Sequence, residues 1–283
     1  MVLKIKLIMK LVKFEHTIFA LPFAYMGAVM AAQGIPTAEK IFWITLAMVG
    51  ARSVAMAWNR LVDWKVDAVN PRTEDRILPQ KMLSKGEVIL FIIGSLFLLL
   101  VAAWQLNSLA FRLSPLAIFL LFFYSYTKQF TWLCHLILGF TIAMASVGSW
   151  IAVTGKISLP PLLLGTAVMF WVSGFDIIYS IQDYEFDSNY GLYSIPVKFG
   201  PQKALRITVI FHTFTFLLLI AVGYYLDLDW LYAMGVIIVG ILLYIESSLV
   251  KRDFEKIKFA FFNINSVVSI NIFIFTLIDY LWA

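Results

Sequence analysis

The sequence predicts an all-α, polytopic membrane protein, and three observations lead to this fold class. Hydrophobic residues make up 61% of the 283-residue chain and charged residues only 14%, whereas an ordinary globular domain has roughly 45–50% and 25%. Apolar segments long enough to cross a bilayer recur along the whole chain. No polar segment between them is long enough to build a soluble core, so we expect a single transmembrane domain over residues 1–283.

Nine of these segments are expected to be transmembrane helices. The first follows a run of lysines that resembles the start of a signal peptide, but the polar interruption "KFEHT" and the many later spans favour an uncleaved helix. Short connections at 34–37 and 225–229 are typical of simple turns. In chain order the nine segments are 14–33, 38–58, 87–106, 109–127, 131–152, 161–181, 204–224, 230–249 and 259–281, of which the fourth is the shortest.

The basic residues predict the orientation of the chain. If the N-terminus lies in the cytoplasm, only Lys40, Arg112 and Lys156 of the 22 Lys and Arg residues fall on the opposite side, with Arg52 inside the second helix. An excess of cations in cytoplasmic connections is the rule for membrane proteins, and one missed helix would destroy it. We therefore expect a multi-pass protein of a bacterial or archaeal plasma membrane with its N-terminus in the cytoplasm.

Acidic residues mark the two longest connections, about 59–86 and about 182–203, which are both predicted to be cytoplasmic. The sequences are "NRLVDWKVD" and "DIIYSIQDYEFD". Corresponding acidic features in two halves of a membrane protein suggest paired sites that face one cavity. The first acidic row consists of Asn59, Asp63 and Asp67, and the second acidic row consists of Asp176, Asp183 and Asp187.

The spacing within each row predicts a metal site. Residues four apart lie on one face of a helix, so the first row forms one stripe and Asp183 with Asp187 forms another. Asp176 lies seven residues before Asp183, nearly on the same line. Like charges so close together disfavour ionisation unless a cation binds there. Oxygen ligands suit Mg²⁺ bound to carboxylates and phosphate oxygens, so we expect each row to bind one ion and both to clamp one phosphorylated substrate.

Other metal centres are less compatible with the composition. A single cysteine excludes an internal disulfide and a cysteine-based cage, and the three histidines are scattered along the chain.

Basic residues next to both rows support a phosphate site. Arg72 and Arg76 follow the first row in "NPRTEDRILP", Lys128 ends the fourth helix, and Lys198 follows the second row. Arginine binds phosphate in a bidentate manner, whereas lysine acts as a point charge. Ordinary positive-inside anchoring is the alternative, and we accept it for the cluster at 251–258.

Arg52 and two tyrosines complete the candidate site. Arg52 lies inside a predicted membrane helix, where an unpaired cation is costly, so it should meet an acid or an anionic substrate. Tyr124 near Lys128, and Tyr179 beside the second row, can donate to phosphate or face a cation with their rings. The sequence assigns His135 no role.

Together these motifs resemble the UbiA superfamily of intramembrane aromatic prenyltransferases, over essentially the whole chain. The resemblance rests on "NxxxDxxxD" near the end of the second helix, "NPRTxxRxLP" after it, "YxYTK" at 124–128 and "DxxYxxxDxxxD" near the end of the sixth helix. The stretches "GFDIIYSIQDYEFD" and "LYSIPVKFG" are similar to the 4-hydroxybenzoate polyprenyltransferase type.

The resemblance implies nine transmembrane helices around a central cavity that opens toward lipid and the cytoplasm. It implies that two Mg²⁺ hold a polyprenyl diphosphate on Asn59, Asp63, Asp67, Asp183 and Asp187. It implies further diphosphate contacts from Arg72, Arg76, Lys128 and Tyr124. On the acceptor side it implies contacts from Arg52 and Ser149, and a role in acceptor binding or deprotonation for Asp176.

The expected activity is transfer of a polyprenyl group to an aromatic acid of the 4-hydroxybenzoate type, ortho to its hydroxyl, in quinone biosynthesis. Prenylation of a naphthoate-type acceptor in menaquinone biosynthesis is an alternative. A secondary transporter with an intramembrane acidic site is the alternative from another class, although acids clustered at one membrane face beside basic connections favour phosphate chemistry. A CDP-alcohol phosphotransferase is disfavoured because Trp64, not glycine, follows Asp63.

The expected partners are the lipid bilayer, the polyprenyl diphosphate and the aromatic acid, and no nucleic acid. The sequence predicts neither the prenyl chain length nor the oligomeric state.

Overall fold

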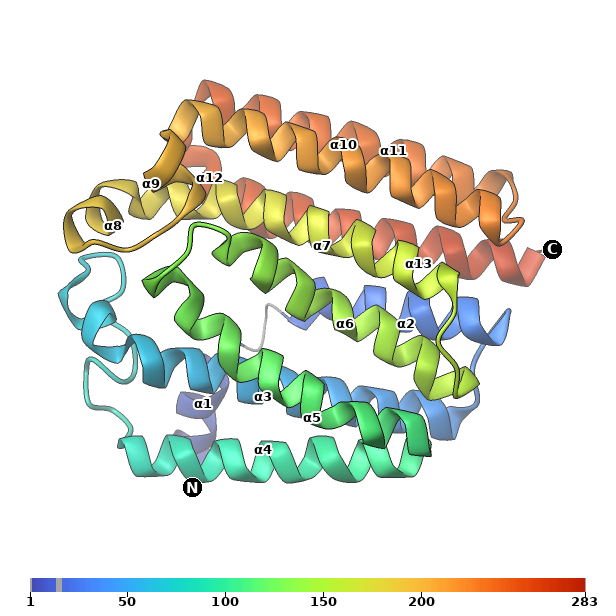
Figure 1. Cartoon of the computed structure of the whole chain (residues 1–283), viewed down its shortest axis with the longest axis horizontal. Coiled ribbons are helices and arrows are strands. Elements are labelled where there is room, and N and C mark those ends of the chain that lie inside the picture. Colours follow the sequence, from blue (N-terminus) through green and yellow to red (C-terminus); the bar gives the residue numbers. More distant parts are fainter. Residues whose placement is uncertain (1, 14–16, 283) are drawn as a thin grey trace.

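The structure of the protein is a computed structural model that describes residues 2–13 and 17–282. Every regular element in these residues is helical, and none of them forms a strand. The long helices run roughly parallel to one another in a bundle (Figure 1). Eight helices of the described residues are long and apolar enough to cross a membrane. The predicted class, an all-α polytopic membrane protein, is therefore confirmed.

The helices have the following bounds in chain order: α1 (Val2–Leu11), α2 (Thr17–Ala32), α3 (Ala38–Val69), α4 (Lys85–Leu106), α5 (Ser108–Phe123), α6 (Cys134–Thr154), α7 (Leu159–Ser180), α8 (Tyr184–Tyr190), α9 (Ile195–Phe199), α10 (Pro201–Tyr225), α11 (Trp230–Arg252), α12 (Ile257–Phe259) and α13 (Asn265–Trp282). Shorter elements are the 3₁₀ turns η2 (Tyr124–Gln129), η3 (Ile181–Asp183) and η4 (Phe254–Lys256), and the π-helical turn η5 (Ala260–Ile264).

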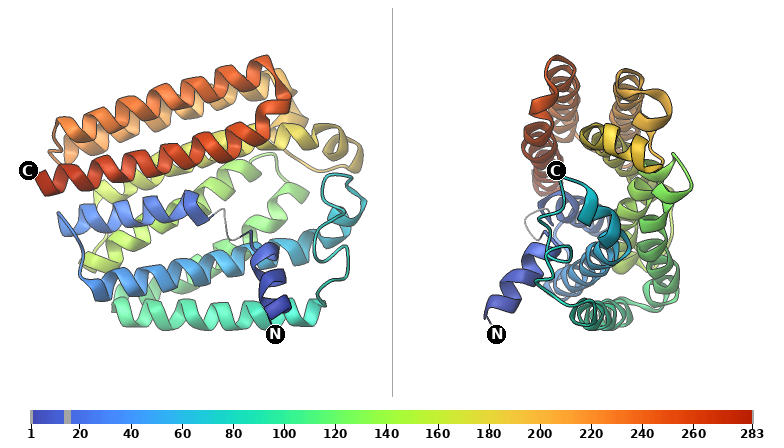
Figure 2. Two further views of the ribbon diagram at one scale, coloured as in Figure 1. Left: turned by 180° about the vertical axis from the view of Figure 1, so that it is seen from behind. Right: turned by 90° about the vertical axis from the view of Figure 1, so that its left-hand side faces the viewer.

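The first predicted span, 14–33, corresponds to α2, which is not among these eight helices. The apolar part of this helix, Leu21–Ala32, is shorter than the other spans, and residues 14–16 at the start of the predicted segment lie outside the described residues. Nine spans and a cytoplasmic N-terminus therefore stay predictions. Helix α2 nevertheless belongs to the bundle, because it packs against α6 and α13, and the left view of Figure 2 shows it beside α13.

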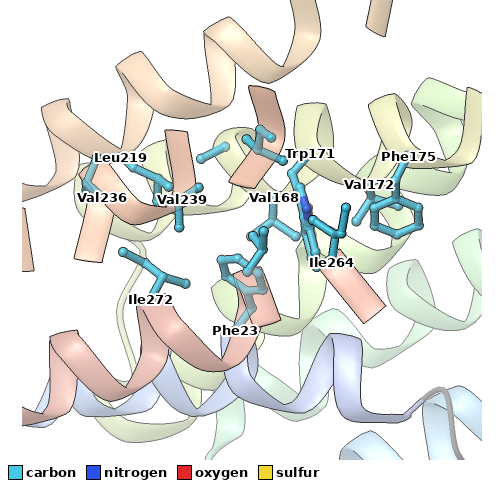
Figure 3. Packing of buried hydrophobic residues seen from close by; sticks show 14 of the residues in the cluster. Phe23, Val168, Trp171, Val172, Phe175, Leu219, Val236, Val239, Ile264 and Ile272 are labelled. Carbon is cyan, nitrogen blue, oxygen red and sulfur yellow. The ribbon is translucent and has the colours of Figure 1, made fainter. Parts of the chain in front are cut away.

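The two largest hydrophobic clusters hold most of the bundle together. The larger joins α2, α6, α7, α10, α11 and α13, and Trp171 lies inside it with its ring against those of Phe23 and Phe175 (Figure 3). The second joins α1, α3, α4 and α5. Lipid tails are as apolar as these side chains, so helices in a membrane associate mainly through close packing of small residues. Gly27 is such a residue, because a Cβ there would collide with the backbone of Ser146.

Helix α3 is longer than predicted, and this positions the first acidic row. The predicted helix ends at 58, whereas α3 continues to Val69, so the whole row lies on one regular helix. Basic side chains contact both of its carboxylates, which removes the like-charge repulsion that disfavours such a helix. The helix ends at Asn70 with an extended backbone, as expected for a residue that precedes a proline.

The second acidic row is not on one regular α-helix, which differs from the prediction. Helix α7 ends at Ser180, the 3₁₀ turn η3 follows, and α8 begins at Tyr184. A 3₁₀ turn has about 3.0 residues per turn instead of 3.6, so it rotates Asp183 away from the line on which Asp176 lies. The connection between α7 and α10 also contains α9.

Candidate active site

Both carboxylates of the first row are buried at the end of α3. Asp63 is 3% exposed and Asp67 is 4% exposed. Asp63 Oδ2 lies 2.9 Å from Lys128 Nζ and accepts a hydrogen bond from Asn59 Nδ2 at 3.1 Å. Asp63 Oδ1 is buried and has no hydrogen-bond partner among the described residues. A buried acceptor without a donor is costly in the absence of a ligand, so this oxygen is the most direct indication of a binding site.

Two arginines contact the other acid of the first row. Arg76 Nη1 lies 2.6 Å from Asp67 Oδ1, and Arg60 Nη1 lies 3.9 Å from Asp67 Oδ2. The sequence analysis identified Arg76 but not Arg60, which is 8% exposed. Arg60 lies seven residues before Asp67, so the two residues share one face of a helix. This spacing could have identified Arg60 from the sequence.

Arg72, in the connection after the first row, contacts the second row. Its Nε and Nη2 atoms donate to the two oxygens of Asp183 at 2.7 and 2.5 Å, and Nη1 donates to the Tyr179 hydroxyl at 3.0 Å. Asn70, at the end of α3, also donates to Asp183 at 3.2 Å. The connection after α3 is thus held against η3, and the sequence analysis did not identify Asn70 as part of this contact.

The electrostatics keep this contact charged. Burial of Arg72 favours its neutral form, but the hydrogen bonds to Asp183 and Tyr179 and their charge outweigh burial, so the pKa of the guanidinium is raised above its ordinary value. The guanidinium carbon also lies 5.2 Å from the centroid of the Tyr179 ring, within the range of a cation–π contact.

Lys128 is the second link between the rows. It forms the ion pair with Asp63 described above, and the charges of Asp67 and Asp187 also act on it. Lys128 thus contacts the first row and is within electrostatic range of Asp187 in the second. That the two rows face a common site stays a prediction.

The donor set of the site is compatible with Mg²⁺, although the carboxylates are not gathered as in an all-protein metal cage. Among residues 2–13 and 17–282, no three His, Cys, Asp or Glu side chains converge on a metal-sized site. Mg²⁺ usually binds one or two carboxylates and completes its shell with water and substrate phosphates. The unpartnered Asp63 Oδ1 is a ligand of the required kind.

An apolar cavity of about 290 Å³ lies between α3, α4, α5 and α6. Arg52, Tyr124 and Ser149, three predicted substrate-binding residues, all line it. Arg52 Nη2 donates to the backbone oxygen of Lys13 at 3.3 Å. The Tyr124 hydroxyl donates to a backbone oxygen of α3 at 2.8 Å, and Ser149 donates within α6 at 2.7 Å. The structure thus places all three residues on one cavity.

A second cavity of about 370 Å³ is strongly basic. Five cationic side chains and one acidic side chain line it together with aromatic rings, which include Tyr179. The cationic residues are Lys10, Lys13, Arg60, Arg72 and Arg76, and the acidic residue is Asp75. A pocket with this balance of charge favours an anion. Arg60, Arg72 and Arg76 line this cavity and also contact acids of the two rows.

Two predicted site residues have other contacts. Asp176 Oδ2 lies 2.7 Å from Nδ1 of His135, whereas Asp183 of the same row contacts Arg72. Lys198 Nζ lies 3.9 Å from the centroid of the Trp132 ring, and no hydrogen bond or ion pair joins it to the acidic rows within the described part of the chain. Its contact with a diphosphate stays a prediction.

The structure is thus an all-helical membrane bundle in which basic side chains contact two acidic rows beside an apolar cavity. Residues 20–267 match the UbiA prenyltransferase family, and the chain belongs to this family.

Solved structures and curated relatives agree with this assignment. The apo structure of a UbiA homolog from Aeropyrum pernix K1 is 32% identical, with a TM-score of 0.87, over 94% of this chain and 98% of that chain. A UbiA homolog from Archaeoglobus fulgidus bound to GPP and Mg²⁺ is 21% identical, with a TM-score of 0.74, over 96% and 99% of the two chains, and shows the same fold.

The similar curated proteins carry a more specific name. The 4-hydroxybenzoate octaprenyltransferase of Francisella tularensis subsp. novicida (strain U112) is 28% identical over 253 residues, which are 89% of each chain. The 4-hydroxybenzoate octaprenyltransferase of Vibrio campbellii (strain ATCC BAA-1116) is 29% identical over 255 residues, which are 89% of this chain and 88% of the relative.

Proposed function

We propose that this prenyltransferase transfers a polyprenyl group from polyprenyl diphosphate to an aromatic acid of the 4-hydroxybenzoate type. The new bond forms at the ring carbon ortho to the hydroxyl. The observation that carries this proposal is the pair of acidic rows, contacted by Arg72 and Lys128, beside an apolar cavity that Arg52 lines. The names of the curated relatives support the choice of acceptor.

In this proposal, the basic side chains that contact the two rows bind the diphosphate. Bound Mg²⁺, two ions on the carboxylates and Asn59, would supply Lewis-acid stabilisation of the leaving group; the homologs from Archaeoglobus fulgidus described with DMAPP or GPP and Mg²⁺ support its use. Arg72, Arg76 and Lys128 neutralise the negative charge that grows as the C–O bond breaks. Each now contacts a carboxylate, so a diphosphate with its cations can replace one set of ionic contacts by another. The proposed ligands are Asn59, Asp63, Asp67, Asp183 and Asp187.

The apolar cavity suits the isoprenoid chain. Its walls come from α3, α4, α5 and α6 and are mostly aliphatic. Leu116 lines it and is 55% exposed, so the cavity reaches the lipid-facing side of α5, where a long chain can leave. The Tyr124 ring faces an allylic cation formed at the polar end, and the apolar walls exclude the water that would capture it.

Polar groups at this cavity orient the acceptor. Arg52 binds the carboxylate of the aromatic acid by a charge-assisted contact, and the Ser149 hydroxyl supplies a further hydrogen bond. Asp176 takes the proton that the acceptor loses. Tyr179, held by Arg72, and Lys198 complete the proposed set of substrate-binding residues.

We also propose that the protein lies in a plasma membrane as one domain over residues 1–283 with nine spans. The N-terminus and the active site face the cytoplasm. The basic residues around the acidic rows support this orientation through the positive-inside rule.

Product analysis tests the proposal. The purified protein is incubated with geranyl diphosphate, Mg²⁺ and either 4-hydroxybenzoate or a dihydroxynaphthoate, and lipid-soluble products are identified by mass spectrometry. We expect a C-prenylated hydroxybenzoate, its loss in excess chelator, and recovery with added Mg²⁺. If only the dihydroxynaphthoate gives a product, the acceptor is of the naphthoate type and not 4-hydroxybenzoate. Activity that persists in chelator would contradict the metal assignment, and solute uptake by vesicles without any product would favour a transporter.

A further inference from the structure

His135 makes two hydrogen bonds that together connect three helices. Its imidazole is buried, with the side chain 3% exposed. Nδ1 lies 2.7 Å from Asp176 Oδ2 in α7. Nε2 accepts the backbone N–H of Ile195, the first residue of α9, at 3.3 Å. A buried imidazole with a partner on each ring nitrogen has its orientation fixed from both sides.

The contact with Ile195 determines the tautomer. A backbone N–H is always a donor, so Nε2 must offer its lone pair and carry no proton. In the neutral ring the other nitrogen then carries the hydrogen. Nδ1–H therefore donates to the Asp176 carboxylate. The hydrogen bond at one ring nitrogen thus determines whether the other nitrogen is protonated.

The neighbouring contacts attach the same segment to the acidic rows. Tyr193 N–H donates to the backbone oxygen of Lys128 at 2.8 Å, and the Cys134 thiol donates to the backbone oxygen of Tyr193 at 3.5 Å. The stretch before α9 is thus held along residues 128–135. Lys128 in turn forms the ion pair with Asp63, so His135 and the first row share one structural support.

The geometry points to His135 as a positioning residue for the transfer reaction. Its Nδ1–H holds Oδ2 of Asp176, whose side chain is 25% exposed, and does not contact Oδ1, which is the oxygen proposed to meet the acceptor. This inference rests on the proposed role of Asp176. In that step the ring carbon forms a bond to the allylic carbon, the C–O bond breaks with its electron pair leaving on diphosphate, and the ring proton goes to Asp176. His135 keeps its own proton throughout.

Kinetics of purified variants test the inference with geranyl diphosphate and 4-hydroxybenzoate. His135→Leu removes the donor and should lower kcat about 10²-fold, as a misplaced catalytic group does, with an unchanged KM for geranyl diphosphate. His135→Asn keeps an N–H donor near the position of Nδ1 and should recover most of the lost kcat. A fall in kcat of equal size in both variants, or a raised KM for geranyl diphosphate, would overturn the inference, because it would indicate general disruption of the fold.

The matched control is Cys134→Ala. It removes the hydrogen bond between Cys134 and Tyr193, which joins the same two segments, but it leaves the contact between His135 and Asp176 intact. We expect kcat within about twofold of the unmodified protein, since a weak thiol hydrogen bond contributes little. A loss as large as that of His135→Leu would show that attachment of the segment, and not Asp176, explains the effect.

A double mutant separates this inference from the proposed function. If His135 acts through Asp176, the variant His135→Leu/Asp176→Asn should be no slower than Asp176→Asn alone, because coupled residues are not additive. Multiplied losses would overturn the inference while the function stands. Full activity of Asp176→Asn would contradict the proposed role of Asp176, and with it the inference that His135 positions this residue. Absence of any prenylated product from the unmodified protein would instead tell against the proposed function.

Discussion

Asp63 and Asp67 lie on one uninterrupted helix, whereas Asp183 ends a 3₁₀ turn and Asp187 belongs to the next helix, although the spacing of the two pairs is the same. In the first row Asp63 contacts Lys128, and Asp67 contacts Arg76 and Arg60. In the second row Asp183 accepts hydrogen bonds from Arg72 and Asn70, which both lie outside its own segment. Equal spacing therefore does not produce equal geometry: the first row is positioned by its helix, and Asp183 by the connection after α3.

The interruption has a consequence for the third acid of the second row. Because α7 ends at Ser180, Asp176 lies on the regular helix, apart from Asp183, and contacts His135. The two carboxylates thus have different partners, a basic guanidinium in one case and an imidazole N–H in the other. Different surroundings suit different tasks, namely binding of the diphosphate and proton transfer from the acceptor.

The largest expected effect is the loss of an acid from either row. Asp63→Asn and Asp183→Asn should each lower turnover about 10³-fold or more, because groups that stabilise the developing charge are worth at least this much together. Product formation by purified variants, with gel-filtration profiles as the control for folding, measures it. Near-normal product from one variant alone would show that the corresponding row is not part of the site.

The next effect distinguishes how the rows are held. Arg72 makes two parallel contacts with Asp183, whereas Arg76 has one contact of 2.6 Å with Asp67. Lysine can replace a single point charge but not a bidentate fork. We therefore expect Arg72→Lys to lower kcat about 10²-fold and Arg76→Lys to have a clearly smaller effect. Equal losses in the two variants would contradict the difference drawn between the rows.

A smaller and more selective effect is expected at the apolar cavity. Arg52→Ala should raise the KM for 4-hydroxybenzoate about tenfold, the value of one hydrogen bond to a charged group, and leave the KM for geranyl diphosphate unchanged. Steady-state kinetics with each substrate varied in turn measures both constants. An unchanged KM for the acceptor would remove Arg52 from the acceptor site.

The smallest effect is expected at a carboxylate outside both rows. Glu246 is fully buried and accepts a hydrogen bond from Asn265 at 2.6 Å, and Asn265 accepts one from the Trp171 indole at 2.8 Å. Glu246→Gln keeps an oxygen for Asn265, so we expect kcat within about twofold, in line with an interhelical contact whose main role is packing. A tenfold loss of kcat would contradict this expectation, because it would show that Glu246 contributes to the reaction although it lies outside both acidic rows.

The sequence by itself determined the class of the protein, most of its spanning helices and the residues of both acidic rows. Backbone groups in a bilayer must be satisfied within their own segment, so long apolar runs can only be helices. Acids in such a chain are costly, which is why Asp63 and Asp183 could be recognised without coordinates. Arg52, Tyr124 and Ser149 were also identified, and they line one cavity.

Only the tertiary structure decided how these residues are held. Arg72 and Asp183 are 111 positions apart in the chain, and His135 and Asp176 are 41 apart, so no local pattern relates them. The acids of α3 likewise have a distant partner, since Lys128 contacts Asp63, and basic partners offset the repulsion between acids on one helix. Periodicity reports which face of a segment a residue occupies, whereas the partner across that face depends on how the helices pack.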